Sequence, residues 1–175
     1  MKRLKYKKDH EYIFVDGYNI INYWDVFKGR EESLEDQRNR LANILAEYAH
    51  MSREKVILVF DGYMVKKSPG ALYSYKGILI IFTKEFETAD HFIERELDRM
   101  GRVRSIRVAT SDNIEQQIIL SRGGSRVSAR EFEIEVYDTL NKVKKNIRSL
   151  NQTYKKIGSL DEDSIEILRK FKDNM

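Results

Sequence analysis

Four aspartates follow apolar stretches of the chain. Asp16 follows YIFV, Asp61 follows KVILVF, and Asp112 follows SIRVAT with one serine between them. Asp90 comes after GILIIF, at the end of TKEFETAD. If the apolar stretches are parallel strands, their carboxyl ends share one edge of the sheet, which is where such sheets bind ligands. We therefore expect the four carboxylates to converge in one small volume.

Converging carboxylates predict a metal site, because they repel one another unless a cation lies among them. The chain has no Cys, and its three histidines lack metal-ligand spacing. Oxygen ligands alone favour Mg²⁺ or Mn²⁺. Such an ion lowers the pKa of a bound water and neutralises charge that develops on a phosphate. The pattern therefore predicts metal-dependent phosphodiester hydrolysis with these aspartates as catalytic acids.

Each acid also has a structural interpretation. Asp112 begins an Asp-x-x-Glu sequence that can cap a helix, and Asp61 with the following glycine can form a turn. Asp90 stands where an acid suits a helix dipole. Asp16 is the hardest to explain in this way, because it ends the strand that reads as most buried, where an uncompensated charge is costly. Four such positions at one sheet edge favour the metal site.

Neighbouring polar residues are candidates for substrate contacts. Asn19 lies three residues after Asp16, where its amide can orient a water or a phosphate oxygen or merely belong to a turn. Thr110 and Ser111 end the fourth apolar stretch and can donate hydrogen bonds to a phosphate or only to the backbone. Arg122 and Arg126 flank a Gly-Gly turn that can also meet a phosphate.

Strands and helices alternate along the chain. Apolar runs predict central parallel strands at 12–15, 55–60 and 77–82, a fourth strand at 105–110 and a short fifth at 125–128. Helical patterns follow Ser33, cover 88–100 and 112–121, begin again at the capping box of Ser128 and Glu131, and follow Ser159. This order predicts a three-layer, Rossmann-like α/β domain with a mostly parallel sheet of four to five strands and a C-terminal helical extension. Residues 62–77 are expected to be the least ordered.

Length and charge indicate a globular protein with a polyanionic partner. The chain has 175 residues, which suits one domain with a sizeable core, and a net charge of +4. Residues 1–8 and 142–158 carry basic side chains and no acids, which fits a polyanion. The longest apolar run, ILIIF, is too short to cross a bilayer, and the basic start lacks the apolar stretch of a secretory signal. We expect no membrane partner and no small-molecule cofactor.

Five segments resemble, in order and spacing, the YacP-like NYN-domain proteins of the PIN-like nuclease superfamily. They are FVDGYNII, VILVFDGYMVK, IIFTKEFETADHFIERE, VATSDNIEQ and SRVSARE, and the resemblance runs from about residue 12 to about residue 150. It implies a Rossmann-like (PIN-like) sheet, an acidic metal centre and endoribonuclease activity. Bacterial members are similar to a ribosome-associated mRNA endonuclease that acts at the ribosomal A site. By motif, Asp16 and Asp90 match the two acids expected to be indispensable, and Asp61 and Asp112 match supporting acids. The Lys-rich extension before the first strand and the 62–77 loop depart from the family pattern.

Residues and resemblance together predict a metal-dependent endoribonuclease that cleaves mRNA at the ribosome and leaves 5′-phosphate and 3′-hydroxyl ends. The expected metal ligands are Asp16, Asp90 and Asp112, with Asp61 in support. The expected RNA contacts are Asn19, Tyr63, Lys66, Lys67, Lys76, Thr110, Ser111, Arg122 and Arg126, and Tyr73 and Tyr75 are also available to stack on bases. The predicted division is a basic extension at 1–11, the nuclease domain at 12–150 and a helical segment at 151–175. A bacterial cytoplasm, or the stroma of an organelle with its own ribosomes, fits this function.

Two other functions are compatible with parts of the sequence. The first is a non-catalytic RNA- or ribosome-binding module with a vestigial acidic site, against which the acids at four strand ends argue. The second is a metal-dependent phosphatase for small molecules. The long basic C-terminal segment argues against it, because a small phosphate ester needs no extended basic surface.

Overall fold

The computed structural model describes residues 4–29, 31–62, 70–101, 105–111, 119 and 124–158. The chain divides into two compact units, Met1–Thr139 and Leu140–Met175. Predicted helices at 112–121 and after Ser159 lie outside the described residues, except for Ile119. Among the helices that the structure describes, none has the length and apolar character needed to cross a membrane.

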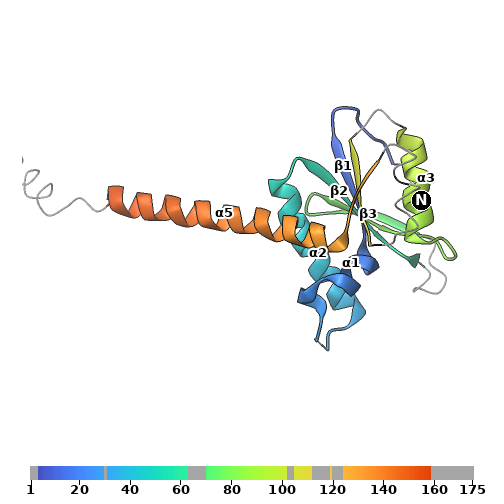
Figure 1. The fold of residues 1–175 in the computed structure, drawn as a ribbon, viewed down its shortest axis with the longest axis horizontal. Coiled ribbons are helices and arrows are strands. Elements are labelled where there is room, and N and C mark those ends of the chain that lie inside the picture. Colours follow the sequence, from blue (N-terminus) through green and yellow to red (C-terminus); the bar gives the residue numbers. More distant parts are fainter. Residues whose placement is uncertain are drawn as a thin grey trace, which may run out of the picture. The chain divides into compact units, whose positions relative to one another are not determined.

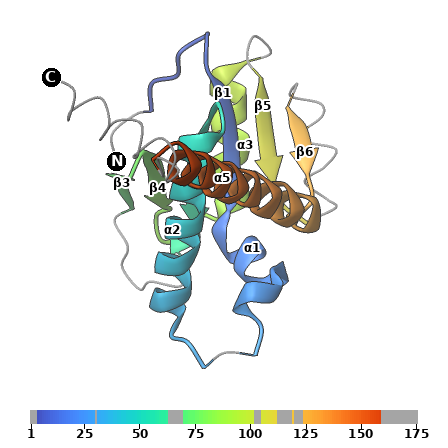
Figure 2. The ribbon, with the colours of Figure 1, turned by 90° about the vertical axis from the view of Figure 1, so that its left-hand side faces the viewer.

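The first unit is built on a six-stranded sheet in the order β3-β4-β2-β1-β5-β6, which Figure 2 shows from β3 at one edge to β6 at the other. The strands are β1 (Glu11–Asp16), β2 (Glu54–Phe60), β3 (Ala71–Tyr75), β4 (Ile78–Phe82), β5 (Ile106–Ala109) and β6 (Ser125–Val127). All neighbours are parallel except β3 and β4, which are antiparallel. This arrangement confirms the predicted α/β fold with a mostly parallel sheet.

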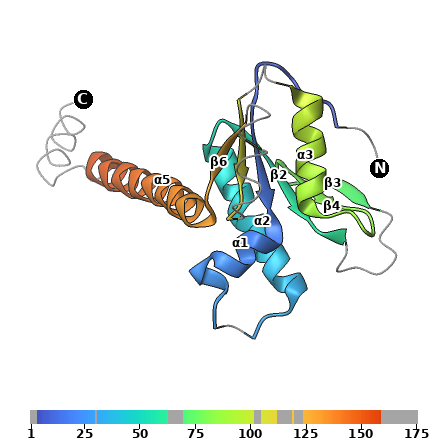
Figure 3. The same cartoon turned by 45° about the vertical axis from the view of Figure 1, so that its right-hand side comes forward.

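The central strands are apolar over most of their length because helices cover both faces of the sheet. In β1, Ile13, Phe14 and Val15 are fully buried. Phe14 belongs to a cluster that includes Phe92 of α3 (Ala89–Met100), whereas side chains at alternating positions of β1 point to the other face. Figures 1 and 3 show α2 (Leu34–Met51) and α3 on opposite faces of the sheet. Continuous burial of β1 and β2 explains why their sequences predicted parallel strands.

The edge strand β3 was not predicted. The sheet therefore has six strands, whereas four to five were expected. Residues 71–75 form β3 within the segment expected to be least ordered, and Lys76 and Gly77 close a two-residue hairpin to β4. Their φ angles are 44° and 89°, the left-handed values that such a tight turn requires. The sequence ALYSY gives a weak strand signal because an edge strand is only partly buried.

Hydroxyl side chains cap the starts of three helices, of which the sequence predicted the capping box of Ser128 and Glu131. The Ser33 hydroxyl accepts the Asp36 N–H at the start of α2, and Thr88 accepts the His91 N–H at the start of α3. The long helix α5 (Ala129–Gly158) opens with the predicted capping box, in which the Glu131 carboxylate accepts the Ser128 N–H. A short helix that was not predicted, α1 (Gly17–Tyr23), starts directly after β1 and is followed by the 3-10 helix η1 (Asp25–Phe27).

The residues before β1 pack onto the first unit. Leu4 and Tyr6 lie against the hydrophobic cluster on the α3 face. The Tyr6 hydroxyl donates a hydrogen bond of 2.7 Å to the buried carboxylate of Glu96, and burial beside this acid raises the pKa of Tyr6 above its ordinary range. The described part of the predicted basic extension therefore anchors itself to α3 through its apolar and aromatic residues.

A partly buried ion-pair network joins the start of β2 to β5 and α5. The Arg107 guanidinium donates to Glu54 at 3.1 Å and to Glu135 at 2.5 Å. The Tyr48 hydroxyl lies within hydrogen-bond distance of both carboxylates and can donate its one proton to either of them. Glu54 is only 9% exposed, so its charge depends on these partners. A buried charge that loses its partner is strongly destabilising.

We therefore expect Arg107→Met to lower the free energy of unfolding by about 2 kcal/mol, below the range for fully buried pairs because Arg107 and Glu135 are partly exposed. The measurement is urea denaturation at pH 7. Adding Glu54→Gln should restore part of the loss, since it removes the unpaired charge. The control is Lys28→Met, which breaks an exposed pair with Asp25 and should change stability by about 0.5 kcal/mol at most. Equal effects of the two single variants would contradict the prediction.

Candidate active site

Asp16 lies at the point where the order of the parallel strands reverses. It is the last residue of β1, which has β2 on one side and β5 on the other. Ligand sites of open α/β sheets lie at such a reversal, at the carboxyl ends of the strands. The Asp16 carboxylate accepts the Asn19 N–H at 3.1 Å and so caps α1. The same side chain thus ends a buried strand and starts a helix.

Asp61 and Asp90 come together through one hydrogen bond. Asp61 directly follows β2, and its Oδ1 accepts the Ala89 N–H at 2.7 Å. Asp90, the next residue, stands in the first turn of α3. Asp61 therefore fixes the start of the helix that carries Asp90, across 28 residues of sequence.

The three carboxylates influence one another electrostatically. Burial raises the pKa of Asp16 to about 7; the Asn19 hydrogen bond opposes this shift, and the charges of Asp90 and Asp61 add to it. Burial also raises the pKa of Asp61, against the Ala89 hydrogen bond and with the help of Asp90. Three of the four predicted acids therefore share one neighbourhood at the sheet edge, although they come from three separate segments.

This neighbourhood has the donor chemistry of a magnesium or manganese site. It offers carboxylate oxygens whose mutual repulsion a cation would relieve. Within the described ranges, no three His, Asp or Glu side chains are placed so as to hold one ion together. The fourth acid, Asp112, lies outside those ranges. The acids thus fit a hard divalent cation in kind, while the described ones do not by themselves make a full set of ligands.

The glycine of the VFDG sequence, Gly62, is required by a close backbone contact. A Cβ atom built on Gly62 would lie 1.9 Å from the carbonyl oxygen of Thr83, so only glycine fits here. The Gly62 N–H donates to the Thr83 hydroxyl at 2.7 Å, and that buried hydroxyl in turn donates to the carbonyl of Glu87. This close approach holds the end of β2, with Asp61, against the loop that leads to Asp90.

We expect Gly62→Ala to lower the free energy of unfolding by about 3 kcal/mol, at the upper end for overpacking, because the obstructing atom belongs to the backbone. It should also reduce any activity that depends on Asp61 and Asp90. The control is Gly124→Ala, whose Cβ would meet a methyl group of Ile119 at 3.1 Å and needs only a small adjustment. Urea denaturation of both variants measures the difference. Equal stabilities of the two variants would contradict the prediction and show that the loop at Thr83 can shift to accommodate the added methyl group.

Four predicted substrate residues lie at this edge, where they mainly hold the strand ends in place. The Asn19 amide oxygen accepts the Ser111 N–H at 2.9 Å, and the Ser111 hydroxyl accepts the Ala129 N–H at 3.1 Å, so β5 is tied to α1 and α5. Thr110 is fully buried. The Arg126 Nε donates to the Thr110 carbonyl at 3.1 Å, which places the base of this guanidinium at the end of β5.

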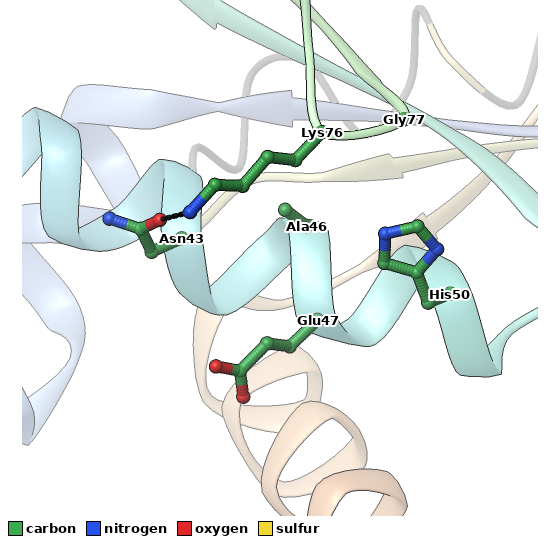
Figure 4. A pocket seen from close by; sticks show the side chains of 6 residues that line it. All are labelled: Asn43, Ala46, Glu47, His50, Lys76 and Gly77. Carbon is green, nitrogen blue, oxygen red and sulfur yellow. Dashed lines mark hydrogen bonds between the residues drawn. The ribbon is translucent and has the colours of Figure 1, made fainter.

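Lys76 is not near the acids. It lies in the β3–β4 hairpin, at the edge of the sheet where β2 and β4 begin, whereas Asp61 follows the end of β2. Figure 4 shows its Nζ donating to the Asn43 side chain, at 2.8 Å, beside a pocket of about 400 Å³ lined also by Ala46, Glu47, His50 and Gly77. Tyr75 also bonds Asn43 there. The expectation that Lys76 holds RNA near Asp61 is therefore not supported, and Tyr63, Lys66, Lys67 and Arg122 lie outside the described residues.

An array of aromatic rings near the acids was not predicted from the sequence. Tyr18 packs on Phe60 with ring centres 5.2 Å apart, and Phe60 stacks on Phe82 at 5.3 Å. Tyr73 also stacks on Phe82, with ring centres 6.4 Å apart, and Arg38 lies over the Phe82 ring while its guanidinium donates to the Tyr18 hydroxyl. Phe60 and Phe82 each end a strand, which was the available sequence signal; the approach of Arg38 depends on how α2 packs.

A mostly parallel α/β sheet with aspartates at the carboxyl ends of its strands is the arrangement that the resemblance to NYN-domain proteins implies. The chain belongs to the YacP-like NYN domain family, whose model matches residues 13–173. It is 35% identical, over 161 residues, to the uncharacterized protein YacP of Bacillus subtilis (strain 168), covering 91% of this chain and 93% of that protein. Membership of this family supports a nuclease-type function related to RNA.

Solved structures agree with this assignment. The chain superposes on the crystal structure of Rae1 (YacP) from Bacillus subtilis with a TM-score of 0.68 and 34% identity, covering 93% of this chain and 92% of that one. A single-residue mutant of the same protein gives the same TM-score and identity over 81% of this chain and 83% of that chain.

Proposed function

We propose that this protein is a metal-dependent endoribonuclease that cleaves mRNA in association with the ribosome, at the A site. The observation that carries the proposal is the electrostatic coupling of Asp16, Asp61 and Asp90 at the strand reversal of the sheet. Partly buried acids that repel one another are costly to the fold, which is typical of sites where a ligand compensates the charge.

The aspartates have different roles in this proposal. Asp16 and Asp90 hold Mg²⁺ or Mn²⁺ with the help of Asp61 or Asp112. The chemistry supplied by the bound ion is a lower pKa of its water and neutralisation of charge on the phosphate. Asp61 also positions Asp90 through the Ala89 hydrogen bond. Because a water attacks rather than the 2′-hydroxyl, the products carry 5′-phosphate and 3′-hydroxyl ends.

Basic surfaces support a polyanionic partner. In the second unit, Lys142, Lys144, Lys145 and Arg148 are exposed on α5, and residues 142–158 contain no acid. In the first unit, Lys5, Lys7 and Lys8 are exposed. Such charges attract RNA over several ångströms and offset the repulsion between its backbone and the acids. Together with the family resemblance, they favour the ribosome as partner and a bacterial cytoplasm as location.

The test is cleavage of an end-labelled mRNA by wild type and Asp90→Asn, with Mn²⁺ or with chelator, and with or without purified ribosomes. We expect cleavage that requires the ion and Asp90, that increases with ribosomes, and that leaves products which a 5′-phosphate-dependent exonuclease degrades. RNA binding without cleavage under every condition would instead support the non-catalytic module. Hydrolysis of p-nitrophenyl phosphate with no RNA cleavage would support the phosphatase.

A further inference from the structure

Phe86 combines an exposed aromatic ring with a strained backbone. Its side chain is 81% exposed, the highest value among the large exposed hydrophobic residues that the structure describes. Its φ angle is 68°, in the left-handed region that is costly for any bulky residue. Exposure of a large apolar ring and a left-handed backbone are two separate costs to the folded protein, and both fall on one residue.

The turn that carries Phe86 is held firmly in this conformation. The Glu87 N–H donates to the Lys84 carbonyl at 3.0 Å and closes a turn with Phe86 as its third residue, a position that favours glycine when φ is positive. The Glu87 carbonyl accepts the Thr83 hydroxyl, and the Glu87 carboxylate pairs with Arg95. The loop is therefore fixed on both sides of Phe86. The ring is exposed because the bonded turn holds it in this conformation.

The turn lies at the acidic edge of the sheet. It connects the end of β4 to α3, and Asp90 follows Phe86 by four residues. Thr83, at the start of the same loop, bonds the N–H of Gly62, the residue after Asp61. The turn that carries Phe86 is thus bonded to the segment after Asp61 and leads directly to Asp90.

We propose that Phe86 is a base-stacking residue, which binds an unpaired nucleobase of the RNA chain next to the phosphate held at the acids. The proposal rests on the proposed nuclease function for the identity of the ligand. An uncharged ring suits this place, because carboxylates repel the phosphate backbone but leave stacking on a base face unaffected. Every base has such a face, so the contact would favour single-stranded RNA with little sequence preference.

Tryptophan fluorescence gives a direct test of the contact. The chain has one tryptophan, Trp24, which is fully buried. In Phe86→Trp, a single-stranded 12-nucleotide RNA added in chelator at low salt should quench the new fluorescence, and the same RNA in a duplex should quench it much less. The control is Met51→Trp, an exposed site at the end of α2. It lies next to the start of β2, whereas Phe86 and the acids lie near the carboxyl ends of the strands. It should respond to neither RNA.

Phe86→Gly should separate binding from folding. We expect the variant to bind the single-stranded RNA about 5- to 150-fold more weakly, as loss of one base stack of about 1–3 kcal/mol implies. Its melting temperature should rise by about 2 °C, because glycine relieves the left-handed strain. Phe86→Tyr should keep the wild-type affinity.

Several results would overturn the stacking role. They are equal quenching at positions 86 and 51, equal quenching by single strand and duplex, or unchanged RNA affinity in Phe86→Gly, the last of which would point to a protein partner for the ring. The test is independent of cleavage, because it is done in chelator. Quenching by a protein that cleaves no RNA under any condition would overturn the proposed enzyme and leave the stacking site standing.

Discussion

Replacing Asp90 by asparagine is expected to abolish RNA cleavage, by more than about 100-fold, and to remove most of the stabilisation by Mn²⁺. In chelator the variant should be at least as stable as wild type, because the Asp90 charge acts unfavourably on Asp16 and Asp61. For wild type, Mn²⁺ at 100 times its Kd should raise the melting temperature by about 5–10 °C, since it binds only the native state. Melting curves with chelator and with Mn²⁺ measure both effects.

A purely structural role for Asp90 predicts the opposite pattern. If Asp90 only complements the N-terminus of α3, its replacement should cost about 0.3–1 kcal/mol in chelator and leave the Mn²⁺ response and cleavage intact. Asp138→Asn is the matched control, because it makes the same change at an exposed position of α5 and should alter none of these properties. A lower melting temperature in chelator with a normal Mn²⁺ response would remove Asp90 from the metal site.

The features that the sequence predicted well are those with a local physical cause. The runs at β1, β2 and β4 are continuously apolar because these strands are buried on both faces, and that condition is visible in composition alone. The capping box of Ser128 and Glu131 satisfies backbone N–H groups within three residues, so it too can be recognised from a short pattern. The gathering of Asp16, Asp61 and Asp90 followed from the rule that parallel strands end at one edge.

The features that were missed depend on contacts between distant residues. The bond between Asn19 and Ser111 spans 92 residues, and no local pattern indicates it. Lys76 was placed near Asp61 because both were assigned to one loop, but β3 carries the chain back to the opposite edge before the hairpin turn. A half-exposed edge strand has few buried positions, so its sequence resembles that of a loop.

Phe86 was also missed, for a different reason. In the sequence it is one apolar residue among charged neighbours, in KEFE, which suggests nothing about its backbone. Its left-handed φ and its exposure appear only when the turn from Lys84 to Glu87 is built. The bonds from Thr83 to Gly62 and from Glu87 to Arg95, which fix that turn, again connect separate segments.

Asp16→Asn is expected to make the stability of the metal-free protein respond differently to pH. The pKa of Asp16 is raised to about 7, first by burial and further by Asp90 and Asp61, whereas it is about 3.9 in an unfolded chain. The folded protein therefore keeps a proton that the unfolded chain has released. The resulting stabilisation is fully present below pH 4 and is lost as the pH rises through about 7. Asparagine cannot ionise, so the stability of the variant should not decrease in this way as the pH rises.

In chelator, the melting temperature of Asp16→Asn minus that of wild type should therefore increase between pH 4 and pH 8, by at least about 3 °C. Mn²⁺ at pH 8 should reverse the order, because it binds the ionised carboxylate of wild type and competes poorly with a proton at pH 5.5. Cleavage by wild type should rise through pH 7, and the variant should cleave at no pH. The same series on Asp138→Asn should follow wild type throughout. A temperature difference that stays constant from pH 4 to pH 8 would show that Asp16 ionises normally, and that the acids at the sheet edge do not form the coupled centre on which the proposed function depends.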